Sequence, residues 1–341
     1  MPVPLRLLPF SIVALTTALA APAFAQEDNN LADEVEQSLR SEEGRPIIVI
    51  GEPELETDEL RDAVRDVAMR GRGYDRPLSR YQAPLCPKVI GMGDRMDTYV
   101  SDRIRRNALE TGVEVAGEGC EANALLIVTD NQGKLIAGMK KNHPELFGVS
   151  ASRRIKAAQD RGDAAIVWSS FIAQGPLGRN GGASDVVAGN SLDGAFANAG
   201  GAAQERRLTR ASRYEITYSI EKTFTTLVFD VDRLNGVHLD QLSDFATLRI
   251  LGRPQPTVEI EEERASSILT LFDAKPSDAP RTMTGLDRAY LKGLYAMRPN
   301  DPSSRLEHFV RIAYEAAQAK NCSGSGSCPV DQSAPPKRQA Q

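Results

Sequence analysis

Apolar residues recur along this chain at two spacings, which separate expected helices from expected strands. A spacing of three or four residues predicts amphipathic helices. In residues 94–111, for example, Met96, Val100, Ile104 and Ala108 fall on one helical face. On this basis helices are expected over residues 57–69, 94–111, 132–141, 151–159 and 239–251.

Two further helices are expected toward the carboxyl end, each behind a capping residue. Thr284 is followed three residues later by Asp287, which is an acidic variant of the capping box. Ser303 or Ser304 is placed to cap the last helix. The chain should therefore close with a helical segment.

Short β-rich runs predict strands between the helices, at residues 46–51, 113–116, 124–129 and 164–172. Strict alternation of Tyr214, Ile216, Tyr218 and Ile220, followed by an apolar run at 224–231, predicts a β-hairpin. Together these elements predict an α+β fold, in which a mixed sheet of short strands packs with helices and a C-terminal helical segment follows.

Residues 1–25 have the pattern of a secretory signal peptide. Arg6 precedes an uncharged, mostly apolar run at 7–20, and Ala23-Phe24-Ala25 supplies a small-x-small cleavage site. The run is shorter than the about 20 residues that span a bilayer, although a retained N-terminal anchor is the alternative. We expect cleavage before Gln26, a periplasmic or secreted location and no transmembrane segment in the mature chain.

Composition divides the remaining chain into five segments. They are an acidic linker at 26–45, an N-terminal α/β part at 46–172, a flexible Gly/Ala/Asn-rich loop at 173–204, a hairpin plus helices at 205–320 in the same globular unit, and a disordered tail at 321–341.

The charge balance is acidic. The 341 residues include 41 Lys and Arg and 46 Asp and Glu, so loss of Arg6 with the leader leaves 40 against 46, a formal charge of −6. This balance argues against nucleic acid as the main partner and against a polybasic membrane contact. The expected partner is an unidentified protein or envelope component.

The four cysteines are Cys86, Cys120, Cys322 and Cys328, and an even number in an exported chain favours disulfides. Three pairings are possible. We favour Cys86–Cys120, which closes a loop around one helix, and Cys322–Cys328, which closes a small ring. A zinc site built from all four is the alternative, but the spacings lack a paired C-x2-C pattern.

No complete catalytic or metal-binding motif is present, and no G-x-S-x-G turn, phosphate loop or dinucleotide fingerprint occurs. The three histidines, His143, His238 and His308, match no metal-site spacing. Asp230 and Asp232 are expected on one side of a strand, where they could bind a cation or act as an acid/base pair, with a solvated strand end as the alternative. These two aspartates and His238 are the polar candidates; no cofactor and no metal are expected, and the catalytic residues stay unassigned.

Three segments after the predicted hairpin follow one another in an informative order. They are FATLRILG at 245–252, SSIL at 266–269, and MTGLD at 283–287 with an apolar continuation to Tyr295. This order resembles the zincin-like metallopeptidase fold, in which a helix with H-E-x-x-H-x-L-G precedes a Ser-Ile-Met turn and a final helix. The similarity covers residues 214–297.

The departures from that pattern affect the chemistry. Phe245 stands at the first histidine position, Ala246 at the glutamate and Arg249 at the second histidine. A zinc-bound water needs histidine ligands and a carboxylate base. The resemblance therefore implies a scaffold without the catalytic apparatus; an ordinary amphipathic helix explains the segment equally well.

A second set of segments consists of LCPKVIG at 85–91, Arg103-Ile104-Arg105, and GCEAN at 119–123. It resembles a group of uncharacterised exported bacterial proteins. That resemblance implies a periplasmic or secreted location and no activity. It also supports the Cys86–Cys120 pair, because both cysteines lie inside matching stretches.

The expected function is a non-catalytic exported binding or envelope-associated module. The alternative is a divergent secreted hydrolase that uses carboxylates or histidines far apart in the sequence. A deep pocket that joins Asp230, Asp232 or His238 to another titratable group would favour the alternative.

Overall fold

The computed structural model describes residues 54–68, 76–147, 149–176, 216, 218–258, 265–273 and 275–325. These residues belong to one compact unit, which begins at Glu52. The expected signal peptide, the linker at 26–45, the predicted strand at 46–51, most of the loop at 173–204, the side chain of Cys322 and the whole of Cys328 lie outside the described residues.

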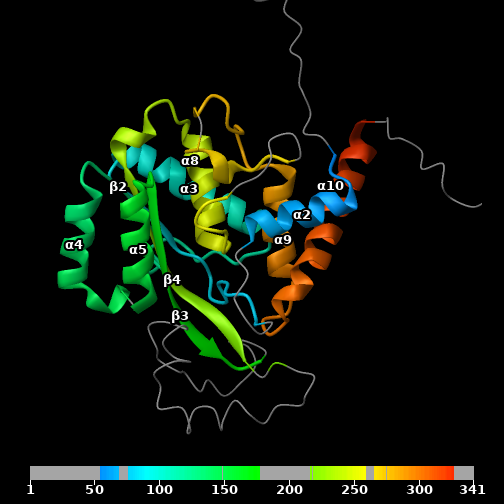
Figure 1. The fold of residues 1–341 in the computed structure, drawn as a ribbon, viewed down its shortest axis with the longest axis horizontal. Coiled ribbons are helices and arrows are strands. Elements are labelled where there is room, and N and C mark those ends of the chain that lie inside the picture. Colours follow the sequence, from blue (N-terminus) through cyan, green and yellow to red (C-terminus); the bar gives the residue numbers. More distant parts are fainter. Residues whose placement is uncertain are drawn as a thin grey trace, which may run out of the picture. The chain divides into compact units, whose positions relative to one another are not determined.

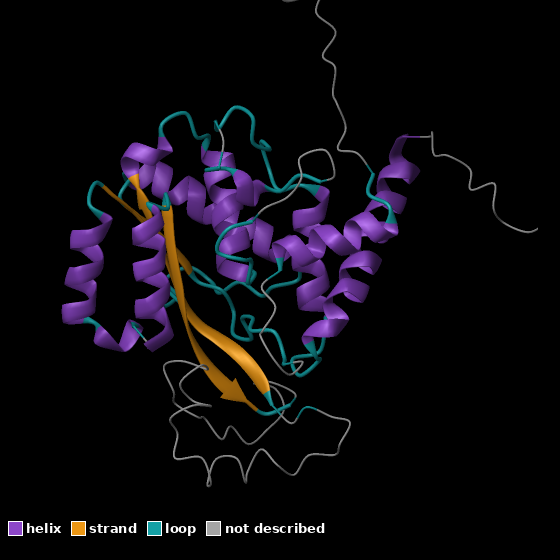
Figure 2. Ribbon diagram, in the orientation of Figure 1, coloured by secondary structure: helices purple, strands orange, loops and turns teal. Residues whose placement is uncertain are grey.

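A four-stranded mixed sheet organises the fold (Figures 1 and 2). Its strands are β1 (Pro87–Ile90), β2 (Ala124–Thr129), β3 (Ala165–Gln174) and β4 (Ser219–Asp230). Their order across the sheet is β1-β2-β4-β3; β1, β2 and β4 are parallel, and β3 is antiparallel to β4. This mixed sheet with its helices confirms the predicted α+β fold.

Seven α-helices occur among the described residues: α2 (Thr57–Val67), α3 (Asp94–Glu110), α4 (Gln132–Asn142), α5 (Val149–Arg161), α8 (Leu239–Leu251), α9 (Gly285–Ala296) and α10 (Leu306–Ser325). Successive side chains of a strand point to opposite faces of the sheet. Leu227 and Phe229 of β4 therefore join the core formed with α3 and α8, whereas Val228 joins Trp168 in the core formed with α4 and α5. Figure 1 shows α4 and α5 on one side of the sheet and α3 and α8 on the other.

The C-terminal helices α9 and α10 pack closely against each other, and α2 contacts both. Gly293 lies at the contact between α9 and α10, where an added Cβ would come within 2.7 Å of the backbone nitrogen of Val310. Thr284 caps α9 as predicted: its Oγ1 accepts from the Asp287 N–H, and Asp287 Oδ2 accepts from the Thr284 N–H. The two helices therefore lie closer together than a side chain at residue 293 would allow.

Helix α8 begins and ends at the predicted residues and is buried on most of its surface. It is anchored by Asp244, which is only 1% exposed. Arg103 of α3 donates from Nε and Nη2 to the two Asp244 oxygens at 2.8 and 2.9 Å. Asn107 donates to Asp244 and to Thr247 at 2.7 and 3.1 Å. These bonds offset the cost of removing the Asp244 carboxylate from water, and they hold α8 against α3.

The hairpin predicted over residues 214–231 is wrong. Residues 219–230 form one strand, and the antiparallel partner of that strand is β3, which precedes the long loop. Glu221 and Lys222 had interrupted the apolar pattern, but both are buried and their polar groups are satisfied inside the fold. Gln174 donates to Glu221 at 2.5 Å, and Lys222 donates to two backbone carbonyls. Strand β4 therefore pairs with a strand distant in the sequence, and no hairpin turn interrupts residues 219–230.

Three smaller differences concern short elements and a helix end. The strand expected at 113–116 is only an isolated bridge between Leu85 and Val115. Strand β1 was not predicted, because four residues carry too little periodicity. Helix α10 runs to Ser325, into the segment expected to be a disordered tail. Across the described ranges, no helix combines the length and the apolar content required to cross a membrane.

Candidate functional site

Asp230, Asp232 and His238 do not converge on a site. The strand ends at Asp230, whose Oδ1 accepts from the Asp232 N–H at 3.1 Å and caps the short 3-10 helix η3 (Val231–Leu234). The expectation that both aspartates share one side of a strand is therefore wrong. His238 is exposed, with Nε2 2.5 Å from Nη1 of Arg281. Within the described ranges, no group of three or more His, Cys, Asp or Glu side chains could hold a metal ion.

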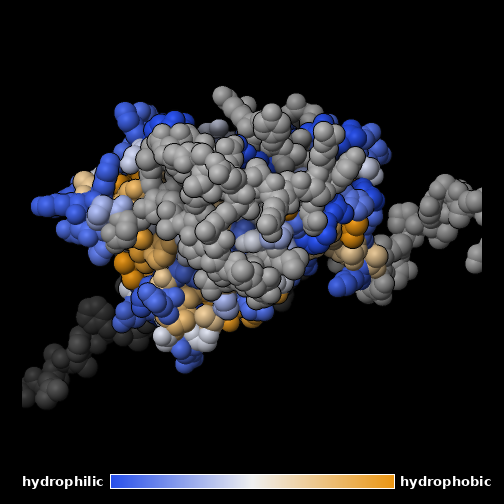
Figure 3. Space-filling view, turned by 90° about the horizontal axis from the view of Figure 1, so that it is seen from below, coloured by the Kyte–Doolittle hydropathy of each residue, from blue (hydrophilic) through white to orange (hydrophobic). Residues whose placement is uncertain are grey.

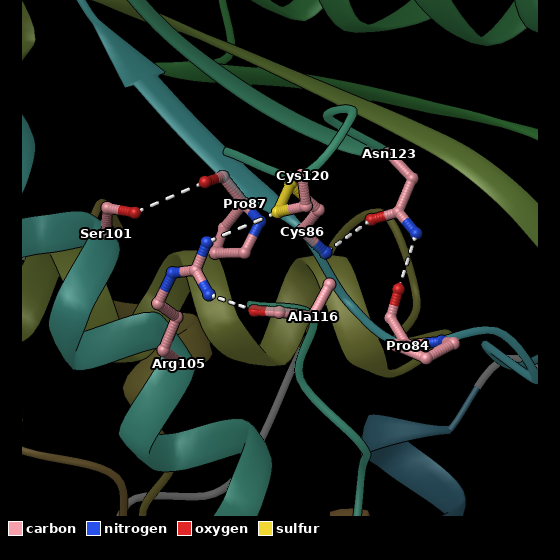
Figure 4. Close-up of a disulfide and its surroundings, with 8 residues drawn as sticks. All are labelled: Pro84, Cys86, Pro87, Ser101, Arg105, Ala116, Cys120 and Asn123. Atoms are coloured by element: carbon pink, nitrogen blue, oxygen red, sulfur yellow. Dashed lines mark hydrogen bonds between the residues drawn. A yellow bond between two sulfur atoms is a disulfide. The ribbon is translucent and has the colours of Figure 1, made fainter. Parts of the chain in front are cut away.

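Cys86 and Cys120 form a disulfide, with their Cα atoms 6.1 Å apart (Figure 4). The bridge joins the residue before β1 to the turn before β2. Asn123 supports it by accepting from the Cys86 N–H at 2.8 Å and donating to the Pro84 carbonyl at 2.9 Å. Arg105 of α3 donates to Ala116 and points a second nitrogen at Cys120 Sγ, 3.5 Å away. The disulfide and its neighbours thus stabilise one edge of the sheet. Because both sulfur atoms are bonded, neither cysteine is a reactive thiol.

A cleft of about 340 Å³ lies at the opposite edge, along β3. One wall is the C-terminal half of α5, and the other is formed by Phe245 and Arg249 of α8, residues 252–258 and residues 269–273. The backbone of β3 runs between these walls, with Ala165, Val167 and Ser169 among the lining residues. None of Asp230, Asp232 and His238 lines this cleft.

Positive charge dominates the lining of the cleft. Six cationic side chains line it against two carboxylates; the cations are Arg154, Arg161, Lys222, Arg233, Arg249 and Arg253, and the carboxylates are Asp163 and Asp273. Arg161 and Asp163 pair with each other at 2.6 Å between Nη2 and Oδ2. The excess of guanidinium groups suits a ligand with carboxylate or phosphate oxygens.

Arg249 is the cation that α8 places in the cleft. Its Nη1 donates to the Gln255 carbonyl at 2.6 Å and its Nη2 to the Pro256 carbonyl at 3.3 Å, while the guanidinium carbon lies 5.2 Å from the centre of the Phe245 ring. Burial lowers the pKa of Arg249 to about 10, an effect that Asp273 and Asp163 oppose. Arg249 therefore remains charged at neutral pH and keeps further N–H donors beyond these two bonds.

Lys222 enters the cleft from β4 and is 2% exposed. Its Nζ donates to the carbonyls of Ile250 and Gly252, each at 2.6 Å. These groups lie at the carboxyl end of α8, where backbone carbonyls lack helical partners. Burial, aided by Arg253, lowers the pKa of Lys222 to about 7. Its first role is thus to close the end of α8.

The three positions singled out by the zincin-like resemblance have separate environments. Phe245 packs edge-on against Phe272 and also contacts Phe229. Ala246 has no exposed surface. Only Phe245 and Arg249 reach the cleft. An aromatic ring and a guanidinium can bind an apolar or anionic group, but they cannot ligate zinc or act as the carboxylate base of a metallopeptidase.

Two carboxylates also reach the cleft. Burial raises the pKa of Asp273 above its usual value, and the charge of Asp163 raises it further while Arg249 opposes both effects. Asp163 is held by two hydrogen bonds from Arg161. The pair differs from the predicted aspartates at 230 and 232, and it lies among a larger number of cations.

Sequence reasoning found Arg249 only as a departure from a motif and missed the other cleft cations. They come from α5, β4, η3 and the segment after α8, which are far apart in the sequence. Seen from below, the visible described atoms are hydrophilic toward both sides of the molecule and include one apolar region at the lower left (Figure 3). No contiguous motif could have revealed a charge cluster assembled by the topology.

Comparisons with known proteins identify no relative. No family model, no curated protein and no solved structure matches this chain.

Proposed function

We propose that this chain is an exported, non-catalytic binding module whose cleft along β3 takes an anionic ligand. The observation that carries the proposal is the set of six cationic side chains against two carboxylates in one cleft. The signal-peptide pattern and the Cys86–Cys120 disulfide support the exported part of the proposal.

The physical basis of binding is the partial burial of the cations. A cation that is removed from water attracts an anion more strongly than an exposed one, because the effective dielectric constant is lower. Arg249 is oriented by two carbonyls and a ring, so an anion would meet a pre-positioned guanidinium. Such pre-positioning reduces the entropy lost on binding.

The test is calorimetric titration of citrate into the oxidised, processed protein at low ionic strength. Citrate should bind, and spermidine should not. Arg233→Gln should weaken citrate binding about threefold, because Arg233 is an exposed cation on the cleft that makes no hydrogen bond or ion pair with the other described residues. Arg249→Gln should weaken it about tenfold, because a charged hydrogen bond to the ligand is lost.

The matched control is Arg106→Gln, which removes the same charge from the exposed side of α3. It should leave citrate affinity unchanged. Absence of citrate binding, or equal weakening by the substitutions at 106 and 233, would contradict a specific anion site.

A divergent secreted hydrolase is the second candidate, and one observation favours it. Asp163 and Asp273 line the same cleft, and burial raises the pKa of Asp273, to which the charge of Asp163 adds against the opposing charge of Arg249. A carboxyl group whose pKa is raised can act as a general acid beside a second carboxylate. Under this alternative, the processed protein should cleave fluorescent casein or a labelled glycan, and Asp273→Asn should abolish that turnover. Absence of turnover favours the binding module.

A further inference from the structure

Strand β3 is an edge strand whose free side faces the cleft. Among the described strands it is last in the order β1-β2-β4-β3, and β4 is its single partner there. The Asp230 N–H donates to the Ala164 carbonyl at 3.1 Å. This bond shows which alternate residues of β3 direct their backbone groups toward β4. In an antiparallel pair, alternate residues direct their N–H and C=O groups toward the partner. Ala165, Val167 and Ser169 therefore direct theirs away from β4.

These three residues also line the cleft, so their backbone N–H and C=O groups that point away from β4 face it. Each is half-buried, whereas Ile166 and Trp168 between them are buried. Over the described ranges, no backbone hydrogen bond outside the β3–β4 ladder involves residues 165, 167 or 169. The cleft floor thus presents a row of main-chain donors and acceptors about 17 Å long, at 3.4 Å per residue.

The opposite edge of the sheet is not organised in this way. Strand β1 has only four residues, and its first is Pro87, which has no N–H. Short strands and proline are common devices that prevent pairing at an edge. Strand β3 has ten residues and no proline, so it is the edge that can accept another strand.

The two walls define what kind of strand fits. Side chains of an added strand would alternate between the α5 wall, which carries Arg154 and Arg161, and the α8 wall, which carries Arg249 and Arg253. Guanidinium groups on both sides favour acidic side chains on the ligand. Main-chain pairing would supply affinity, and the walls would supply specificity.

From this geometry we infer that the ligand is an extended acidic polypeptide segment, which adds to the sheet as a strand alongside residues 165–169 and directs carboxylates to the arginines of both walls. This inference rests on the proposed anion-binding function and names its ligand class. It requires no chemical step and no co-reactant.

The test uses a fluorescein-labelled five-residue probe, Val-Glu-Glu-Val-Val, with a blocked C-terminus, and measures fluorescence anisotropy with the oxidised, processed protein. Its adjacent glutamates point to opposite sides of a strand, so that one can reach each wall. The probe should bind at least about tenfold more tightly than citrate, because it adds main-chain bonds to the charge contacts. The matched Val-Lys-Lys-Val-Val probe should not bind. Arg233→Gln should weaken the acidic probe about threefold, and Arg106→Gln should not.

Backbone pairing is tested by N-methylation of the probe. An added strand pairs through alternate residues, so methylation of residues 1, 3 and 5 and methylation of residues 2 and 4 should differ. One pattern should reduce affinity about tenfold or more, and the other should leave it nearly unchanged. The two methylated probes serve as each other's controls and do not depend on a protein variant that could misfold.

The outcomes separate the two proposals. If citrate binds and the substitution at 233 weakens it, but both methylated probes bind like the parent, strand addition is overturned and anion binding stands. If the acidic probe binds no more tightly than citrate, the polypeptide ligand is likewise overturned. If neither citrate nor the acidic probe binds, both proposals fail.

Discussion

At the scale of single residues, Lys222 shows how a buried cation can serve structure and site together. Its two carbonyl contacts complete the end of α8, and that end carries Arg249 into the cleft. The ammonium also lies 5.6 Å from the centre of the Tyr81 ring. Removal of the lysine would leave two carbonyls without their donor and loosen the segment that begins at Gly252.

Because the pKa of Lys222 is lowered in the folded protein, the free energy of unfolding should depend on pH. Burial lowers that pKa from 10.5 to about 7 in the folded protein. Between these two values the unfolded chain binds more protons, so the free energy of unfolding rises with pH. We expect Lys222→Met to lower the free energy of unfolding by about 2–4 kcal/mol at pH 9, because two buried carbonyls lose their donor.

Urea unfolding at pH 7 and pH 9 measures both effects. Between pH 7 and pH 9, the free energy of unfolding of the wild-type protein should rise by up to about 2 kcal/mol relative to that of the variant. Only the wild type carries the titrating group. Lys134→Met, on the exposed side of α4, is the matched control and should show the wild-type slope. Equal slopes for the wild type and Lys222→Met would show that the lysine is not desolvated.

At the scale of elements, the disulfide strengthens the first β-α-β unit. It spans 34 residues of sequence and encloses β1 and α3. Arg103, Ile104 and Arg105 lie on the enclosed helix: Arg103 binds Asp244, Ile104 is fully buried, and Arg105 contacts Cys120. One turn of α3 thus contacts α8, the core and the bridge.

Replacement of Cys86 and Cys120 by serine should lower the free energy of unfolding by about 3–4 kcal/mol, because the unfolded chain regains the entropy of a closed loop of this length. Reduction of the wild-type protein should have a similar effect. Citrate affinity of the folded variant should be unchanged, because the cleft lies at the other edge of the sheet.

Urea unfolding with and without reductant, together with non-reducing peptide mapping, provides the measurement. A linked peptide containing both cysteines should be found in protein recovered from the periplasm. Free thiols at both positions would contradict the pairing, and an unchanged stability after reduction would contradict its structural role.

At the scale of the whole molecule, the two edges of the sheet differ in their construction. One edge is short and covalently secured, and the other is long and open to the cleft. The molecule is acidic overall, with a net charge of −5, yet the cleft gathers six cations. At 0.1 M salt, the screening length of about 10 Å limits the attraction between these cations and an anion to the neighbourhood of the cleft.

The sequence predicted those parts of the fold that depend on local pattern. Helix α8 and strand β2 have the predicted bounds, since their apolar periodicity and end signals agree. The β3–β4 pairing was missed, because it depends on partners for Glu221 and Lys222 that lie elsewhere in the chain. The cleft was missed for the same reason: its charges converge only once α5, β3 and α8 are packed together.

The strand order has a consequence for how the sheet forms during synthesis. Strand β4 is the last of the four to emerge, yet it lies between β2 and β3. The unit of β1, α3 and β2 can assemble early, but β3 has no pairing partner until residues 219–230 are available. For that interval, β2 and β3 both expose unpaired strand edges, which are the surfaces most prone to aggregation. The first half of the chain therefore completes its sheet only when a central strand from the second half is inserted.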